Sequence, residues 1–164
     1  MSLTADILRS YRAPRRVVHR QLQAGRREDR ALVYLMSACV LIFIAQWPAL
    51  SRAAHLDPSV PFDARLGGAL MGVLFVLPLV AYAISFLLWL ALRLFGPVER
   101  YGVRLALFWA MLAVSPLMLA QSALSSIVGT GGVVLLFGLG VLAAFLVILV
   151  AGLRAALEDG RTAA

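Results

Sequence analysis

Four long apolar runs without a charged residue constrain this chain more than any other feature. Each run has between 20 and 27 residues and contains no Asp, Glu, Arg or His. A helix needs about 20 apolar residues to cross a hydrocarbon core ~30 Å thick. The runs therefore predict an all-α membrane protein built as a bundle of four transmembrane helices. They cover residues 31–50, 66–92, 105–128 and 133–153.

The basic residues are distributed unevenly between the segments that flank these runs. All 15 are arginine, and the first and third connections together hold only two of them. Segments rich in basic residues remain in the cytoplasm. Four spans then place both termini and the second connection inside. Exclusive use of arginine is associated with GC-rich bacterial genomes, so the expected location is the bacterial inner membrane.

The chain of 164 residues has room for one membrane domain. We expect an arm over residues 1–30, a transmembrane domain over 31–154 and a short cytoplasmic tail over 155–164. A net charge of +7 could indicate nucleic-acid binding. No aromatic residues alternate with the arginines to stack on bases, however, so the charge is better explained by membrane topology and by attraction to anionic lipid.

The arm has helical periodicity. Apolar residues recur at spacings of four and three from Leu3 to Leu22, which places them on one face of a helix. Pro14 suits only the first turn of a helix. The pattern predicts two short amphipathic helices, over residues 4–12 and 14–24, with Gly25 as the C-terminal stop.

Five arginines of the arm are candidate contacts for lipid or for a protein. A basic amphipathic helix that precedes a span usually lies in the membrane interface. A docking helix for another integral membrane protein is the alternative, and the arm alone does not separate the two. The candidates are Arg9, Arg12, Arg15, Arg16 and Arg20.

Few polar or helix-breaking residues lie inside the runs. Pro78 and Pro116 each remove a backbone hydrogen bond and predict a kink. Tyr82 and Ser115 are candidates to compensate for the missing bonds. Gln121 is the most buried-looking amide, and we expect it to bond between helices, with a substrate site as the less favoured alternative.

Small residues four apart indicate close helix contacts, either within the bundle or against a partner. The candidate pairs are Gly68 with Gly72 and Gly140 with Ala144. Tryptophan favours membrane interfaces. We therefore expect Trp47 to mark the outer end of the first span, and Trp89 and Trp109 to anchor the cytoplasmic side.

Residues for catalysis are scarce. The two histidines, His19 and His55, are predicted on opposite sides of the membrane, and Cys39 is the single cysteine. No metal site can be built from them with normal spacing. Residues 129–132 are rich in glycine but lack the lysine of a phosphate-binding loop, so they predict a turn. No enzyme activity, cofactor or metal is expected.

Several segments resemble the Yip1-domain family in its short, alphaproteobacterial-like form. The similar stretches are residues 7–16, residues 27–32, residues 101–109 and Ser115-Pro116-Leu117. The resemblance implies an integral membrane protein without known catalysis. Eukaryotic members of the family bind small GTPases, and their pattern includes a long cytosolic amino-terminal domain. This chain lacks that domain and has four predicted spans where five are usual, so GTPase binding is not implied.

Three functional hypotheses follow. The first is a non-enzymatic inner-membrane protein that packs with other membrane proteins or organises lipid. The second is an accessory subunit of a larger, bioenergetic membrane complex, because the predicted outer connections are short. The third is a small transporter or channel that uses the kinks near Gln121. The absence of ionisable residues from the runs argues against an ion pump. The sequence does not give the oligomeric state.

Overall fold

The structure is a computed structural model, and it describes residues 3–129 and 131–162. These residues form helices and contain no strand, which confirms the all-α fold class. Four helical segments are long and apolar enough to cross a membrane, as predicted. The elements are α1 (Leu3–Ser10), α2 (Pro14–Gln23), α3 (Glu28–Leu56), α4 (Phe62–Met71), the π-helical turn η1 (Gly72–Val76), α5 (Leu77–Leu92), α6 (Arg100–Val128) and α7 (Gly132–Thr162).

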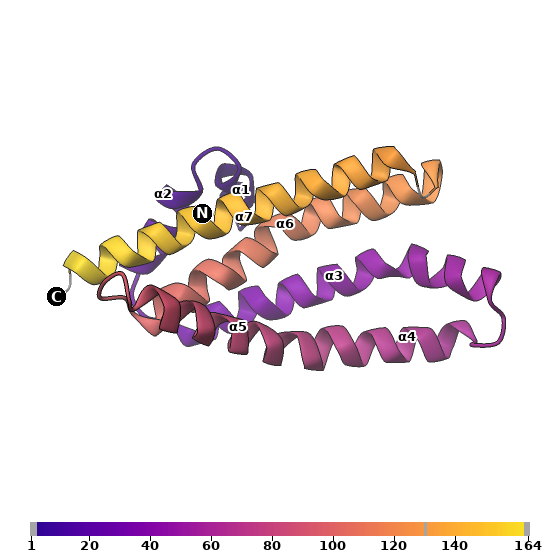
Figure 1. The fold of residues 1–164 in the computed structure, drawn as a ribbon, viewed down its shortest axis with the longest axis horizontal. Coiled ribbons are helices and arrows are strands. Elements are labelled where there is room, and N and C mark those ends of the chain that lie inside the picture. The colour runs from indigo at the N-terminus through magenta and orange to yellow at the C-terminus, as the bar shows by residue number, and fades with distance from the viewer. Residues whose placement is uncertain (1–2, 130, 163–164) are drawn as a thin grey trace.

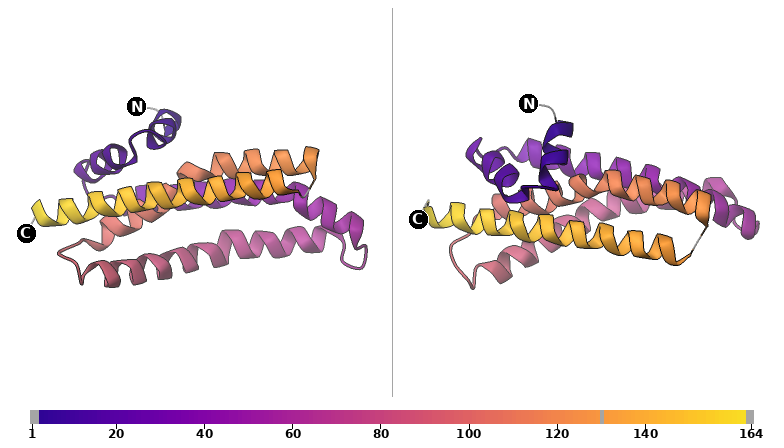
Figure 2. Two further views of the ribbon diagram at one scale, coloured as in Figure 1. Left: turned by 45° about the horizontal axis from the view of Figure 1, so that its top comes forward. Right: turned by 90° about the horizontal axis from the view of Figure 1, so that it is seen from above.

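The long helices are arranged as two hairpins. One hairpin pairs α3 with the continuous segment α4–η1–α5, and the other pairs α6 with α7 (Figure 1). The hairpins join mainly through α3 and α6. The arm, α1 and α2, lies beside α6 and α7 at the end that also carries the C-terminus (Figure 2). We call this the arm end, and the opposite end, with the α3–α4 and α6–α7 connections, the far end.

Two helices continue past the C-terminal ends of the apolar runs that predicted them. α3 passes through Pro48 and ends at Leu56, six residues beyond the expected span of residues 31–50. α7 continues to Thr162, which makes most of the expected tail helical. Hydropathy locates the apolar window, whereas a helix continues wherever its polar side chains find partners or water. Arg52, for example, donates to the Ser125 carbonyl at 2.9 Å and joins α3 to α6.

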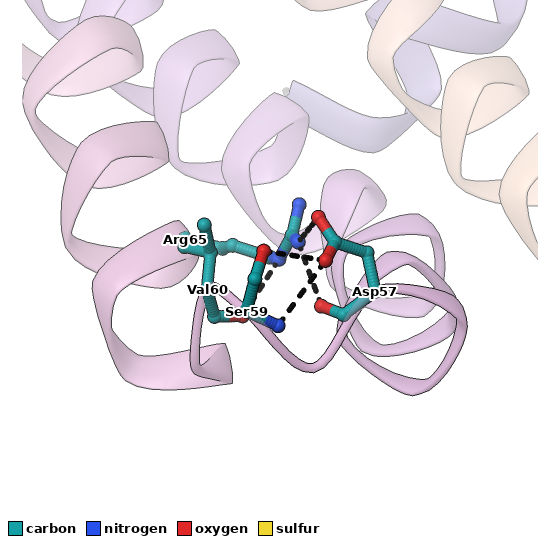
Figure 3. Close-up of polar contacts among 4 residues, drawn as sticks. All are labelled: Asp57, Ser59, Val60 and Arg65. Atoms are coloured by element: carbon teal, nitrogen blue, oxygen red, sulfur yellow. Dashed lines mark hydrogen bonds and ion pairs between the residues drawn. The ribbon is translucent and has the colours of Figure 1, made fainter.

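A polar cluster organises the far-end connection between α3 and α4 (Figure 3). The Asp57 carboxylate accepts bonds from the Ser59 hydroxyl at 2.5 Å and the Ser59 amide at 3.1 Å, and it pairs with Arg65 at 2.9 Å. Arg65 also donates to the carbonyls of Asp57 and Val60. The Ser59 bonds, followed by Arg65, hold the pKa of the Asp57 carboxyl below its usual range.

The arm contains the two helices that its periodicity predicts. They begin and end within two residues of the expected bounds, α1 over Leu3–Ser10 and α2 over Pro14–Gln23. Pro14 occupies the first turn of α2. Gly25 has φ +89°, a left-handed conformation that glycine adopts without strain, and its amide donates to the Leu22 carbonyl. It stops α2 as predicted.

The two intramembrane prolines are accommodated differently. Pro116 lies inside α6 and leaves the Leu112 carbonyl without its helical donor. The Ser115 hydroxyl donates to that carbonyl at 2.8 Å, which confirms the predicted compensation. Pro78 instead follows the π-helical turn η1, which adjusts the backbone upstream. Tyr82 does not compensate for Pro78 as predicted, because its ring packs edge-on against Phe108, with centroids 5.0 Å apart.

Two reciprocal pairs of small residues bring α6 and α7 together. A Cβ added to Gly102 would lie 3.0 Å from the Cβ of Ala156, and one added to Gly152 would lie 3.0 Å from the Cβ of Ala106. Each helix thus carries glycine and alanine four residues apart, and the antiparallel arrangement faces each glycine with an alanine. Such pairs allow close backbone packing.

The small-residue pairs predicted from the sequence lie elsewhere. A Cβ on Gly68, Gly72 or Gly140 would meet no atom within 4 Å. Only Ala144 packs against the core. The three glycines therefore make no close helix contact within the bundle, and their role against a partner stays a prediction. A spacing of four does not determine which side of a helix faces its neighbours.

Candidate functional site: the arginine-lined groove of the arm

The arm is docked against the bundle through apolar residues of α2. Val17, Val18 and Leu22 are buried. Val18 lies beside Gly152 of α7, and Leu22 beside Gly102 of α6, so the close α6–α7 approach also forms the surface that receives the arm. Much of the predicted amphipathic face is consequently covered by protein. Leu3 and Leu8 of α1 remain exposed at 43% and 70%.

Polar contacts attach the end of α1 to α6. The Trp109 indole N–H donates to the Ser10 hydroxyl at 2.9 Å, and that hydroxyl donates to the Asp6 carbonyl at 2.8 Å. The Tyr11 hydroxyl donates to the carbonyl of Ala113. We call these contacts of Ser10 and Tyr11 the arm latch. Burial raises the pKa of the Tyr11 hydroxyl, so this group keeps its proton and donates at neutral pH.

The latch corrects the prediction for Trp109. This side chain is fully buried and packs edge-on against Tyr34, so it does not anchor the protein at a lipid interface. An indole has one N–H donor that needs a partner when buried. Ser10 supplies the partner. Ala113 is next to Leu112, whose carbonyl has lost its donor to Pro116, so both attachment points lie close to the kink of α6.

Arg30 fixes the connection between the arm and α3. Its guanidinium donates to the carbonyl of Gln21 at 2.6 Å, to the carbonyl of Gly25 at 3.3 Å and to the hydroxyl of Tyr101 at 3.1 Å. A cation is favourable at the C-terminus of α2, where carbonyl groups lack helical donors. The arm is therefore held at both of its ends.

Three of the five predicted arginines have acidic partners. Arg15 pairs with Glu158 of α7 at 2.5 Å, and Arg20 pairs with Asp6 at 2.5 Å. Arg9 lies 3.9 Å from the same carboxylate. Exposed pairs of this kind contribute at most about 1 kcal/mol each. Their main effect here is geometric, because they fix α1, α2 and α7 relative to one another.

The arm encloses a groove lined by four of these arginines. Arg12 and Arg16 are exposed and have no acidic partner among the described residues. The hollow has a volume of about 660 Å³. Its walls combine positive charge with apolar surface. We call it the arm groove, and its lining residues are Leu8, Arg9, Tyr11, Arg12, Ala13, Arg16, Val17 and Arg20.

A second hollow of about 740 Å³ adjoins the arm groove. Arg12, Arg16 and Arg20 line both, and Arg15, His19 and Glu158 are added here. The two hollows place all five predicted arginines around one surface. Five arginines with the carboxylates of Asp6 and Glu158 leave a net charge of +3 next to exposed Leu8, which suits a ligand that is anionic at one end and apolar at the other.

The interhelical hydrogen bond expected of Gln121 is not formed within the described residues, and the surroundings of Gln121 are mainly apolar. Gln121 lines a hollow of about 310 Å³ between α6 and α7, together with apolar side chains such as Met111, Met118 and Phe145. Its amide lies against Gly138, where an added Cβ would be 2.6 Å from the amide nitrogen. Gln121 thus fills the space that Gly138 leaves. No charged residue lines this hollow among the described residues.

Metal ligands are not clustered in the described part of the chain: no group of three or more His, Cys, Asp or Glu side chains is close enough to hold an ion. In the predicted turn over residues 129–132, Gly129 has φ +80° and ends α6, and Thr130 lies outside the described residues.

No protein-family model, curated protein or solved structure matches this chain.

Sequence reasoning found the arginines but missed the residues that position them. The periodicity does not distinguish Tyr11 from the rest of the apolar face, Ser10 lies outside that face, and Glu158 falls in the predicted short cytoplasmic tail. The signal for the docking surface was present, since Gly102 with Ala106 and Gly152 with Ala156 have the same spacing as the pairs chosen. Nothing in one sequence ranks these pairs against the others.

Proposed function

We propose that this protein is a non-enzymatic integral protein of the bacterial inner membrane, with both termini in the cytoplasm. Its arm groove binds the headgroups of anionic phospholipids, and through this contact the protein organises lipid and neighbouring membrane proteins. The observation that carries the proposal is the arm groove itself. Four arginines converge on one hollow, and two of them, Arg12 and Arg16, have no acidic partner among the described residues.

The docking of the arm supports lipid as the ligand. Because Val17, Val18 and Leu22 pack on the bundle, the position of α2 is fixed at the arm end. The same end carries the α5–α6 connection, the first turns of α6 and the last turns of α7, which together hold five more arginines (Figure 1). Each basic residue near an anionic leaflet contributes about 1 kcal/mol. Exposed Leu3 and Leu8 are suited to the apolar side of the interface.

The resemblance to the Yip1-domain family agrees with this proposal, because it also implies a multi-pass membrane protein without catalysis. The segments of similarity include residues 7–16, which contain the arm latch and three arginines of the groove.

An accessory subunit of a larger membrane complex is the second candidate. The observation that favours it is the outer face of α7, where large apolar side chains are exposed and Gly140 leaves space for a neighbouring backbone. Lipid tails would cover the same face. Capture of one stoichiometric complex in mild detergent, from cells that express the protein at its natural level, would favour this candidate. The transporter hypothesis remains a prediction without a specific structural observation in its favour.

Thermal unfolding in mixed micelles tests the lipid proposal. A ligand that binds only the folded state raises the melting temperature. We expect phosphatidylglycerol to raise it more than phosphatidylcholine does. An Arg12→Gln, Arg16→Gln variant should lose most of that difference, since two contacts of about 1 kcal/mol each are removed.

An Arg154→Gln, Arg161→Gln variant is the matched control. It removes the same charge from exposed positions of α7 at the same end of the molecule. The control should keep the phosphatidylglycerol effect. Equal losses in the two variants would show that total charge, and not the arm groove, is responsible, and the proposal would be abandoned.

A further inference from the structure

The geometry points to a second anion site, a pocket between α5 and α6 that binds the phosphodiester of one anionic phospholipid. The pocket lies at the arm end of these helices but does not include the arm, so the inference does not depend on the arm groove. Its volume is about 190 Å³. Its lining residues are Tyr82, Ser85, Phe86, Trp89, Arg100 and Arg104.

Trp89 forms the base on which Arg100, which lines the pocket, and Arg93, which is not part of the lining, are arranged. Its indole N–H donates to the Val98 carbonyl at 3.1 Å, which fixes the ring against the α5–α6 connection. The Arg100 guanidinium lies 4.2 Å from the ring centroid, and that of Arg93 lies at 5.4 Å. Cation–π contacts of this length hold a guanidinium in place without using its N–H donors. The N–H donors of Arg93 and Arg100 therefore remain available to bind an anionic ligand.

The acidic residues nearby do not neutralise the cluster. Glu99 precedes Arg100 but pairs with Arg26, and Glu28 pairs with Arg104 at 2.5 Å. Neither Arg93 nor Arg100 has an acidic partner among the described residues. Three arginines with one carboxylate leave a net charge of +2 around the pocket.

Arg104 is the second arginine that lines the pocket. The ion pair with Glu28 holds its guanidinium, and its Nε is buried with no hydrogen-bond acceptor in the described part of the chain. Because that nitrogen is closed to solvent, a ligand in the pocket would bind the terminal N–H groups of Arg100 and Arg104. Phosphate oxygens accept two parallel bonds from such groups.

The size and surroundings of the pocket favour a lipid over a soluble phosphate compound. Pockets for whole small molecules usually have about 300–1,000 Å³. The 190 Å³ here suits a phosphodiester and little more. One wall is Phe86, which is 51% exposed, and Leu87 and Leu90 continue this exposed apolar surface along α5. An acyl chain can lie along it, whereas free phosphate makes no use of it. Basic pockets between helices are known to bind lipid headgroups.

Fluorescence quenching of Trp89 by brominated lipid tests the inference. The full chain with Trp47→Phe keeps two tryptophans, Trp89 and the buried Trp109. It is placed in vesicles of phosphatidylcholine that contain a fixed fraction of brominated phosphatidylglycerol or, for comparison, brominated phosphatidylcholine. A Trp47→Phe, Trp89→Phe variant gives the quenching of Trp109 alone, which is subtracted. We expect stronger quenching by the phosphatidylglycerol. An Arg93→Gln, Arg100→Gln variant should lower the apparent affinity about fivefold for each arginine removed, the change that ~1 kcal/mol represents.

The Arg154→Gln, Arg161→Gln and Arg12→Gln, Arg16→Gln variants serve as controls and should both keep the preference. If the preference for phosphatidylglycerol is lost in the pocket variant and in both controls, or in none of the three, the inference is overturned. Since the arm variant is measured in parallel, failure of this pocket and failure of the arm groove are distinguishable.

Two further measurements complete the test. Arg100→Lys keeps the charge, and it should bind less well than wild type because lysine lacks the planar, bidentate donors; an unchanged melting temperature establishes that the variant is folded. Inorganic phosphate is then added at constant ionic strength. If it removes the preference for phosphatidylglycerol, the pocket binds free phosphate and the assignment to lipid is wrong. If the preference persists, the assignment stands.

Discussion

The two halves of α6 have similar hydropathy but very different surroundings. Between Tyr101 and Ser115 every residue is buried except Arg104 and Met111, whereas from Pro116 to Val128 no residue is buried. The first half is enclosed by the arm, α3, α5 and α7. The second half contacts fewer neighbours and turns more of its surface outward. Apolar composition therefore shows that a helix enters the membrane, but not which part of it forms the protein core.

The same contrast runs along α7. At the arm end, Gly152 and Ala156 contact α6 and the arm, and at the far end Gly140 faces open space. A membrane offers no hydrophobic advantage for burying one apolar residue over another, since lipid tails are equally apolar. Close packing and hydrogen bonds must therefore decide which residues are buried between helices. In this protein the reciprocal glycine–alanine contacts of α6 and α7 and the hydrogen bonds that hold the arm lie at the arm end.

Glycine replacement at the two ends of α7 should give the largest difference. In Gly152→Leu the new side chain has no space, because its first carbon already lies 3.0 Å from the Ala106 Cβ. We expect a loss of about 1–3 kcal/mol in stability and release of the arm. Gly140→Leu, at a position with no atom within 4 Å, should change stability by less than about 0.5 kcal/mol. Thermal unfolding in detergent and proteolysis of the arm measure both effects, and equal losses would refute the contrast.

The arm latch should give an intermediate effect. Tyr11→Phe removes the bond to the Ala113 carbonyl and should cost about 1 kcal/mol, with faster hydrogen exchange over residues 3–23. Pro116→Ala restores a regular backbone near that carbonyl. The cost of Tyr11→Phe should therefore be smaller in the Pro116→Ala background. A double-mutant cycle measures this coupling, and strict additivity would show that the kink and the latch are independent.

The far-end Asp57 cluster should show the smallest effect, confined to low pH. Because the pKa of Asp57 is lower in the folded loop than its ordinary value of about 3.9, its carboxylate stabilises the loop above that value. The contribution is lost as the pH falls through the folded pKa. We expect hydrogen exchange in residues 57–65 to rise there and the arm end to change less. Asp57→Asn should remove the pH dependence of hydrogen exchange in the loop. If that pH dependence is unchanged in the variant, it arises from a group other than Asp57.

The sequence predicted the features that depend on local pattern. The four membrane-spanning helices, the two arm helices, the stop at Gly25 and the bond from Ser115 near Pro116 all follow from residues close together in the chain. The burial of Trp109 and the choice of Gly102 and Gly152 as contact residues depend on which helix faces which. Tryptophan suits both an interface and a core, and glycine is common in membrane helices, so residue type alone does not decide.

The arm latch also has a consequence for the order in which the protein assembles. Tyr11 and Ala113 are separated by 102 residues, and Arg15 and Glu158 by 143. Since a chain is synthesised from its amino terminus, the arm emerges first but finds its binding surface only after α6 and then α7 have been made. In the interval Val17, Val18 and Leu22 have no protein to cover them. We expect a basic amphipathic helix in that state to partition to the membrane surface, so that the bilayer holds the arm before the bundle does.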